Sequence, residues 1–144
     1  MRLFLDANIL FSAAHNPSGN ACALFSLARK GVVQLYSSGF AHDEARRNIA
    51  LKFPQCREAL EDLLKEIEQV REPQLQYVRA ARLAGLPEKD APILAAATAA
   101  RVDALVTGDK RHFGTLFGQR VGSVIVLPPA DALQLVLERL PLSR

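Results

Sequence analysis

Cysteines are few in this sequence and long apolar runs are absent. Its two cysteines, Cys22 and Cys56, form no Cys-x-x-Cys pair, which excludes a zinc knuckle and a disulfide framework. We expect both to be buried free thiols. No apolar run approaches the roughly 18 residues that a membrane helix needs, and Asp6 comes too early for a secretory signal peptide. We therefore expect a soluble cytoplasmic protein that does not contact a membrane.

Internal repeats, low-complexity tracts and long linkers are also missing from the chain. Its 144 residues, 49% of them hydrophobic, suffice for one compact core, so we expect residues 1–144 to form a single domain. The net charge of +3 favours a polyanionic partner only slightly. That preference grows if the acids gather in one site, because the remaining surface is then more basic.

Short apolar runs alternate with stretches of helical periodicity, which predicts an α/β fold with a parallel sheet covered on both sides. The expected strands are 2–5, 32–36, 104–107 and 121–127. The expected helices are 9–14, 20–30, 40–52, 55–70, 90–101 and 130–140. The segment 74–82 fits either a helix or an irregular crossover.

Four carboxylates lie at the ends of these expected elements. Asp6 follows the first strand and Asp109 follows the strand at 104–107, where ligands bind in open α/β sheets. Glu44 lies early in a helix and Asp90 at a helix start. Each alone also fits an ordinary cap or turn residue.

A shared pocket for these acids would need a counter-charge. Like charges about 4 Å apart repel by about 4 kcal/mol at an effective dielectric near 20. Convergence therefore requires a cation or raised pKa values. Because the set holds oxygen donors and no His or Cys, it suits Mg²⁺ or Mn²⁺.

Four short motifs, taken in order along nearly the whole chain, resemble those of the PIN-domain nucleases. They are Leu5-Asp6-Ala7-Asn8, Glu44-Ala45-Arg46-Arg47-Asn48, Asp90-Ala91-Pro92-Ile93-Leu94-Ala95-Ala96 and Thr107-Gly108-Asp109. The resemblance implies a three-layer α/β/α sandwich with a central parallel sheet of four or five strands. It places the first and fourth strands side by side at the centre, so that the acids following them flank a topological switch point.

The resemblance also implies a function, which is metal-dependent endonucleolytic cleavage of RNA, in particular of single strands, leaving a 5′-phosphate and a 3′-hydroxyl. The implied metal ligands for one or two Mg²⁺ or Mn²⁺ ions are Asp6, Glu44, Asp90 and Asp109. Asn8 resembles the polar residue that the family has after its first acid, and Thr107 resembles the hydroxyl residue often found two positions before its last acid. The resemblance implies that both orient water or substrate. Many small members are the toxin of a toxin–antitoxin pair and form homodimers, so an antitoxin protein and a second copy are the implied partners.

Some neighbouring residues are further candidates for this site. Glu44 is preferred to the adjacent Asp43 because its following residues fit the motif. Cationic side chains that follow the acids are candidates for phosphate contacts; they are Arg46, Arg47, Lys110, Arg111 and His112. The helix at 55–70 is a candidate dimer or antitoxin surface, and packing of its apolar face against the sheet is the alternative.

Other functions fit less well. A phosphatase of the haloacid-dehalogenase kind needs a second acid two residues after the nucleophile, where this chain has Asn8. A phospho-acceptor receiver domain needs an acidic pair after the first strand, where Asp6 stands alone. The stronger alternative is a PIN-like module that binds RNA or protein without cutting. A purely RNA-binding surface has no use for a negative pocket, and metal-dependent cleavage separates the two hypotheses.

Overall fold

The computed structural model of the chain describes residues 1–88 and 90–140. Over these residues six strands form one sheet in the order β3-β2-β1-β4-β6-β5. The strands are β1 (Arg2–Leu5), β2 (Gln34–Ser38), β3 (Glu68–Val70), β4 (Ala104–Val106), β5 (Arg120–Val121) and β6 (Val124–Leu127). Only the pairing of β5 with β6 is antiparallel among the described strands.

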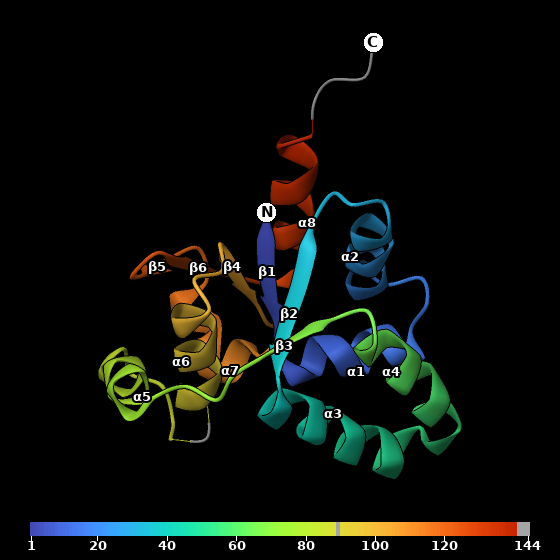
Figure 1. The fold of residues 1–144 in the computed structure, drawn as a ribbon, viewed down its shortest axis with the longest axis horizontal. Helices are drawn as coiled ribbons and strands as arrows, with labels where there is room; N and C mark the ends of the chain where they lie inside the picture. Colours follow the sequence, from blue (N-terminus) through green and yellow to red (C-terminus); the bar gives the residue numbers. More distant parts are fainter. Residues whose placement is uncertain (89, 141–144) are drawn as a thin grey trace.

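Helices cover both faces of this sheet (Figure 1). The helices of the described residues are α1 (Ala7–His15), α2 (Asn20–Arg29), α3 (Gly39–Lys52), α4 (Arg57–Leu64), α5 (Leu75–Leu83), α6 (Ala91–Ala99), α7 (Lys110–Phe113) and α8 (Pro129–Glu138), with short 3-10 turns at Pro54–Cys56 and Gly114–Leu116. Helices α1, α2 and α4 lie on one side of the sheet, and α5 and α6 lie on the other. The expected three-layer α/β/α sandwich is confirmed.

The number of strands differs from the expected four or five. The segment expected as one helix over 55–70 ends at Leu64, and Glu68–Val70 forms the edge strand β3. Ile67 and Val70 continue the helical spacing of the apolar residues before them, which is why one long helix was expected. In a segment as short as β3, the spacing of apolar residues cannot distinguish a helix from a strand. The strand expected over 121–127 is a hairpin, because Gly122 takes a left-handed conformation (φ 63°) that suits a tight turn.

Strands β1 and β4 lie side by side at the centre of the sheet. Leu3 pairs with Ala104 and Leu5 with Val106, and all the residues of β4 are buried. Because helices cover both faces, each residue of these strands meets apolar neighbours. Connections leave β1 toward β2 and β4 toward β6, so the switch point lies between β1 and β4, as the resemblance implies.

Several other expectations can be compared with the helices. Segment 74–82 is helical, as α5.

The apolar face of α4 is buried through Leu60, Leu63 and Leu64, so this face packs inside the molecule, and a dimer or antitoxin contact through the rest of the helix stays a prediction. Cys22 and Cys56 are free but half-buried, not fully buried. None of the helices in the described residues is both long and apolar enough to cross a membrane.

Candidate functional site

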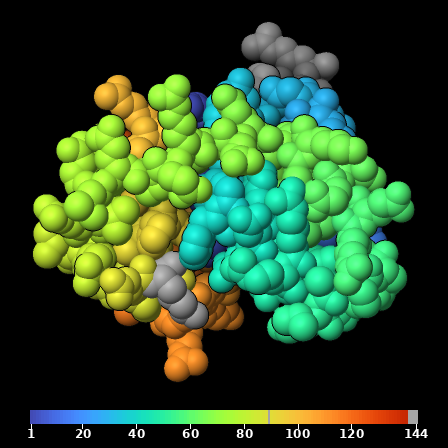
Figure 2. All heavy atoms as spheres, turned by 60° about the horizontal axis from the view of Figure 1, so that its bottom comes forward, coloured from blue at the N-terminus to red at the C-terminus, as the bar shows by residue number. Residues whose placement is uncertain are grey.

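A cavity of about 420 Å³ opens where β1 and β4 end at the switch point. Its lining includes all four acids singled out from the sequence, which are Asp6, Glu44, Asp90 and Asp109. They come from the end of β1, from α3, from the start of α6 and from the end of β4. Figure 2 brings this end of the molecule forward and shows a notch between the teal surface of α3 and the yellow and orange surface of α6 and α7.

Asp6 is the most buried of these acids. The residue is 4% exposed, and its carboxylate accepts hydrogen bonds from the backbone N–H of Ala7 (2.7 Å), from Thr107 Oγ1 (2.8 Å) and from Asn8 Nδ2 (3.1 Å). Burial raises the pKa of Asp6 to about 6; the hydrogen bonds lower it in part, and the charge of Glu44 adds to the increase. An isolated carboxylate in this position is therefore held at a free-energy cost.

Asn8 and Thr107 connect the two central strands at the pocket. Asn8 Oδ1 accepts from the Gly108 N–H at 2.7 Å, and Asn8 Nδ2 donates to Thr107 Oγ1 at 3.2 Å. Thr107 Oγ1 also accepts from the Asp109 N–H at 3.2 Å. These bonds link Asn8, in the first turn of α1, to the residues that follow β4, and so fix the separation of the two segments that carry Asp6 and Asp109.

Helix α3 turns Glu44 toward the pocket and its neighbour away from it. The helix starts at the end of β2, where Ser38 caps its first turn, and half-buried Glu44 lines the cavity. Asp43 is exposed and pairs with Arg46 at 3.2 Å. Arg46 also pairs with Glu61 of α4 at 2.9 Å. Surface ion pairs thus occupy the guanidinium of Arg46 in this structure, and its phosphate contact stays a prediction.

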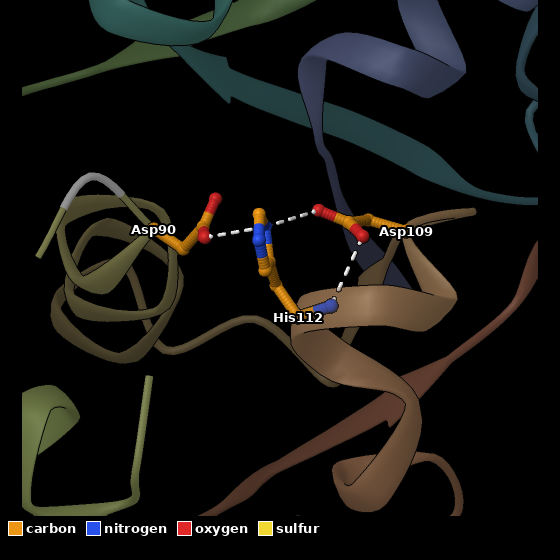
Figure 3. A group of neighbouring side chains, drawn as sticks. All are labelled: Asp90, Asp109 and His112. Atoms are coloured by element: carbon orange, nitrogen blue, oxygen red, sulfur yellow. Dashed lines mark hydrogen bonds and ion pairs between the residues drawn. The ribbon is translucent and has the colours of Figure 1, made fainter. Parts of the chain in front are cut away.

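His112 lies between two of the acids (Figure 3). Its Nδ1 is 2.9 Å from Asp90 Oδ2 and 2.9 Å from Asp109 Oδ2, and its backbone N–H donates to Asp109 Oδ1 at 3.1 Å. One ligand atom from each of the three residues lies within 4.8 Å of the others. The sequence predicts a phosphate contact for His112. In the structure its imidazole instead lies beside the acids, so a nitrogen joins a group of candidate ligands that was expected to hold oxygen donors alone. The available signal was the spacing of His112 from Asp109, since residues three apart share a helix face.

Two further polar residues, Ser12 and Asn48, line the cavity and were missed. Each lies one helical turn beyond a residue already singled out, Ser12 after Asn8 on α1 and Asn48 after Glu44 on α3. Residues four apart on a helix are neighbours, so this signal was present in the sequence. The pocket thus offers carboxylate, amide and hydroxyl groups, a donor set that hard divalent cations prefer.

Besides Arg46, three of the expected cations lie on the surface. Lys110 and Arg111 begin α7 and are exposed, as is Arg47 on α3. They follow Asp109 and Glu44 in the chain, so their exposed side chains can reach an anion that approaches the pocket.

Comparison with known proteins agrees with this geometry. A family model described as the PIN domain matches residues 2–111. Among curated proteins no significant match is found.

Solved structures of similar fold include VapBC2 from Rickettsia felis bound to a DNA fragment from its promoter, with a TM-score of 0.65 and 18% identity over 89% of this chain and 98% of that one. PAE2754 from Pyrobaculum aerophilum has a TM-score of 0.69 and 16% identity over 96% and 97% of the two chains. FitAcB from Neisseria gonorrhoeae has a TM-score of 0.58 and 22% identity over 89% and 98%.

Proposed function

Because the chain belongs to the PIN domain family, we propose that it is an endoribonuclease that depends on Mg²⁺ or Mn²⁺ and cleaves single-stranded RNA. The observation that carries this proposal is the cavity at the switch point, which Asp6, Glu44, Asp90 and Asp109 line together. Carboxylates from four distant segments repel one another when they line one cavity. A cation bound between them would offset this repulsion.

The donor set fits a divalent ion of this kind. Burial raises the pKa of Asp6, and the charges of Glu44 and Asp90 add to the increase, so a cation would stabilise a buried carboxylate whose cost the hydrogen bonds from Thr107 and Ala7 offset only in part. In this proposal Asp6 and Asp109 are the principal ligands. Glu44 and Asp90 bind directly or through water.

The other residues position these ligands and the substrate. When bound, the ion polarises the scissile phosphate, acidifies water and stabilises charge that develops during displacement. Thr107 and Asn8 hold the Asp6 carboxylate through their hydrogen bonds, and they orient water or substrate at the same edge. His112 holds Asp90 and Asp109 toward one another.

The test is metal-dependent cleavage of single-stranded RNA by the purified chain. Asp6→Asn and Asp109→Asn each remove a ligand charge, and we expect each to lower the rate at least about 100-fold while the circular dichroism spectrum is retained. Asp43→Asn is the matched control, because Asp43 is an exposed acid beside Glu44 that pairs with Arg46 instead of lining the cavity.

Full activity in either ligand variant would remove that residue from the mechanism. RNA binding without cleavage, with Mg²⁺ or Mn²⁺ present, would favour the alternative of a non-catalytic PIN-like binding module.

We also propose that the chain is the toxin of a toxin–antitoxin pair and forms a homodimer in the cytoplasm. Support comes from the family and from the fold shared with VapBC2 bound to promoter DNA and with FitAcB. Arrest of growth on expression, relieved by a co-expressed partner protein, would test the toxin proposal. A light-scattering mass equal to the monomer would contradict the dimer.

A further inference from the structure

We infer that Phe11, His15 and Phe53 form a stacking platform for a base of single-stranded RNA, next to the acidic cavity. This inference rests on the proposed ribonuclease function and names a substrate contact for it. We call these three residues the aromatic platform. The ammonium of Lys52 lies over the Phe11 ring, with Nζ 5.6 Å from the centre of the ring.

The rings of the platform are in mutual contact. His15 and Phe53 stack with centroids 4.3 Å apart and planes 8° from parallel. Phe11 lies tilted against both, at 4.6 Å from His15 and 5.6 Å from Phe53. All three residues are half-buried, so part of each remains exposed, and they lie near the carboxyl ends of α1 and α3.

The platform continues the cavity along two helices. Asn8 and Ser12 of α1 line the cavity, and His15 is the last residue of the same helix. Asn8 and His15 are seven residues apart on α1, which corresponds to about 10 Å along the helix. On α3, Lys52 lies one turn beyond the cavity residue Asn48. Helices α1 and α3 lie side by side in Figure 1 and pack together.

The chemistry of the cavity explains why a stacking contact is useful. Four carboxylates line it, and their charge repels the phosphates of a bare RNA strand. Affinity must then come from surfaces outside the cavity. Aromatic rings bind any base through its face, and a neighbouring cation such as Lys52 attracts the phosphates on either side. A platform about two helical turns from the acids can hold a nucleotide near the cleaved one.

The experiment measures the affinity of the full chain for a fluorescent single-stranded RNA of about 12 nucleotides, by anisotropy in EDTA at low salt. Phe53→Leu keeps an apolar side chain but loses the aromatic face, and we expect it to weaken binding about 5- to 150-fold. The matched control is Phe117→Leu, because Phe117 is also half-buried but bridges to Val126 of β6, which lies beyond β4 on the far side of the sheet from α3.

A second measurement leaves the protein unchanged. Oligonucleotides in which one base at a time is removed should bind the unaltered chain weakly at one or two positions. In Phe53→Leu this sensitivity should vanish. In cleavage assays with Mn²⁺ the same variant should raise KM and leave kcat nearly unchanged, as expected for a residue that binds the ground state and transition state equally.

The outcomes separate this inference from the ribonuclease proposal. If the chain cleaves RNA but neither Phe53→Leu nor base removal changes affinity, the platform is overturned and the nuclease stands. If RNA is bound with base-dependent affinity but never cleaved, the platform stands and the nuclease falls. Unchanged RNA affinity with a lower light-scattering mass would assign the rings to contact between copies and overturn the inference, as would equal losses in Phe117→Leu.

Discussion

At the scale of single residues, Asp6 shows how one side chain serves two demands. Its carboxylate accepts the N–H of Ala7 and so caps α1, and it also lines the acidic cavity. The first task explains why α1 starts at Ala7, directly after the strand, although the periodicity predicts a start at residue 9. The second task leaves a buried charge beside Glu44 and Asp90, with a pKa raised to about 6.

The raised pKa predicts a pH dependence of the metal-free stability. An unfolded Asp6 titrates near 3.8 and the folded one near 6, so the folded state binds the extra proton between these values. The resulting destabilisation is absent below pH 3.8, grows as the pH rises toward 6, and reaches about 3 kcal/mol above it. Urea unfolding in EDTA should show the wild type losing stability relative to Asp6→Asn between about pH 4 and pH 7.5. A constant difference between the two proteins would contradict the shifted titration.

Sequence reasoning found some of these residues and overlooked others. Asp6 and Asp109 directly follow apolar runs, so local pattern locates them. His112 was overlooked as a neighbour of both acids, since its place between Asp90 and Asp109 depends on how α6 lies against α7. The packing of elements that are distant in the chain produces no periodic pattern in the sequence. Phe11 and Phe53 lie 42 positions apart (53 − 11), and their contact was hidden for the same reason.

At the scale of elements, the junction between β1 and β4 holds the site together. The register pairs Leu5 with Val106, and the next residue of each chain segment, Asp6 and Thr107, continues the connection through a side-chain hydrogen bond of 2.8 Å. Local patterns located both central strands because each is short, apolar and buried. They missed β3, whose residues are exposed or half-buried and therefore lack the apolar run of a central strand.

Thr107→Val tests this junction. The substitution keeps the shape but removes a donor from the buried Asp6 carboxylate and an acceptor from Asn8 and the Asp109 N–H. We expect a loss of about 1–3 kcal/mol in the free energy of unfolding near pH 7.5 and slower cleavage. The matched control is Thr98→Val, because the Thr98 hydroxyl donates to the Leu94 carbonyl within α6 and, among the described residues, does not join the network at the junction. Equal effects of the two substitutions on stability would contradict a special role for the junction.

At the scale of the whole molecule, the cavity joins the two halves of the chain. Asp6 and Glu44 come from the first half, and Asp90 and Asp109 from the second. An ion bound there would contact segments that separate on unfolding, and would therefore stabilise the folded state only. The alternation of strands and helices was enough to predict the sandwich, but not that the four acids share one cavity, which depends on the order of strands in the sheet.

Metal removal should therefore lower the thermal stability. At about 100 times its dissociation constant, an ion that binds only the folded chain adds about 2.7 kcal/mol, which corresponds to a rise in Tm of roughly 5–10 °C for a protein of this size. Calorimetry with Mn²⁺ and with EDTA measures the difference. The rise should shrink in Asp109→Asn and persist in Asp43→Asn. A Tm that ignores Mn²⁺ would contradict a cation site in the cavity.

The pairing of β1 with β4 joins Asp6 to residues about a hundred positions later in the chain. During translation the amino-terminal acids emerge from the ribosome early, but the cavity has no second wall until Asp109 has also left the exit tunnel. A chain that is still without β4 and Asp109 therefore carries Asp6 and Glu44 but cannot form the complete cavity. In the ribonuclease proposed above, cleavage has to wait until β4 has paired with β1.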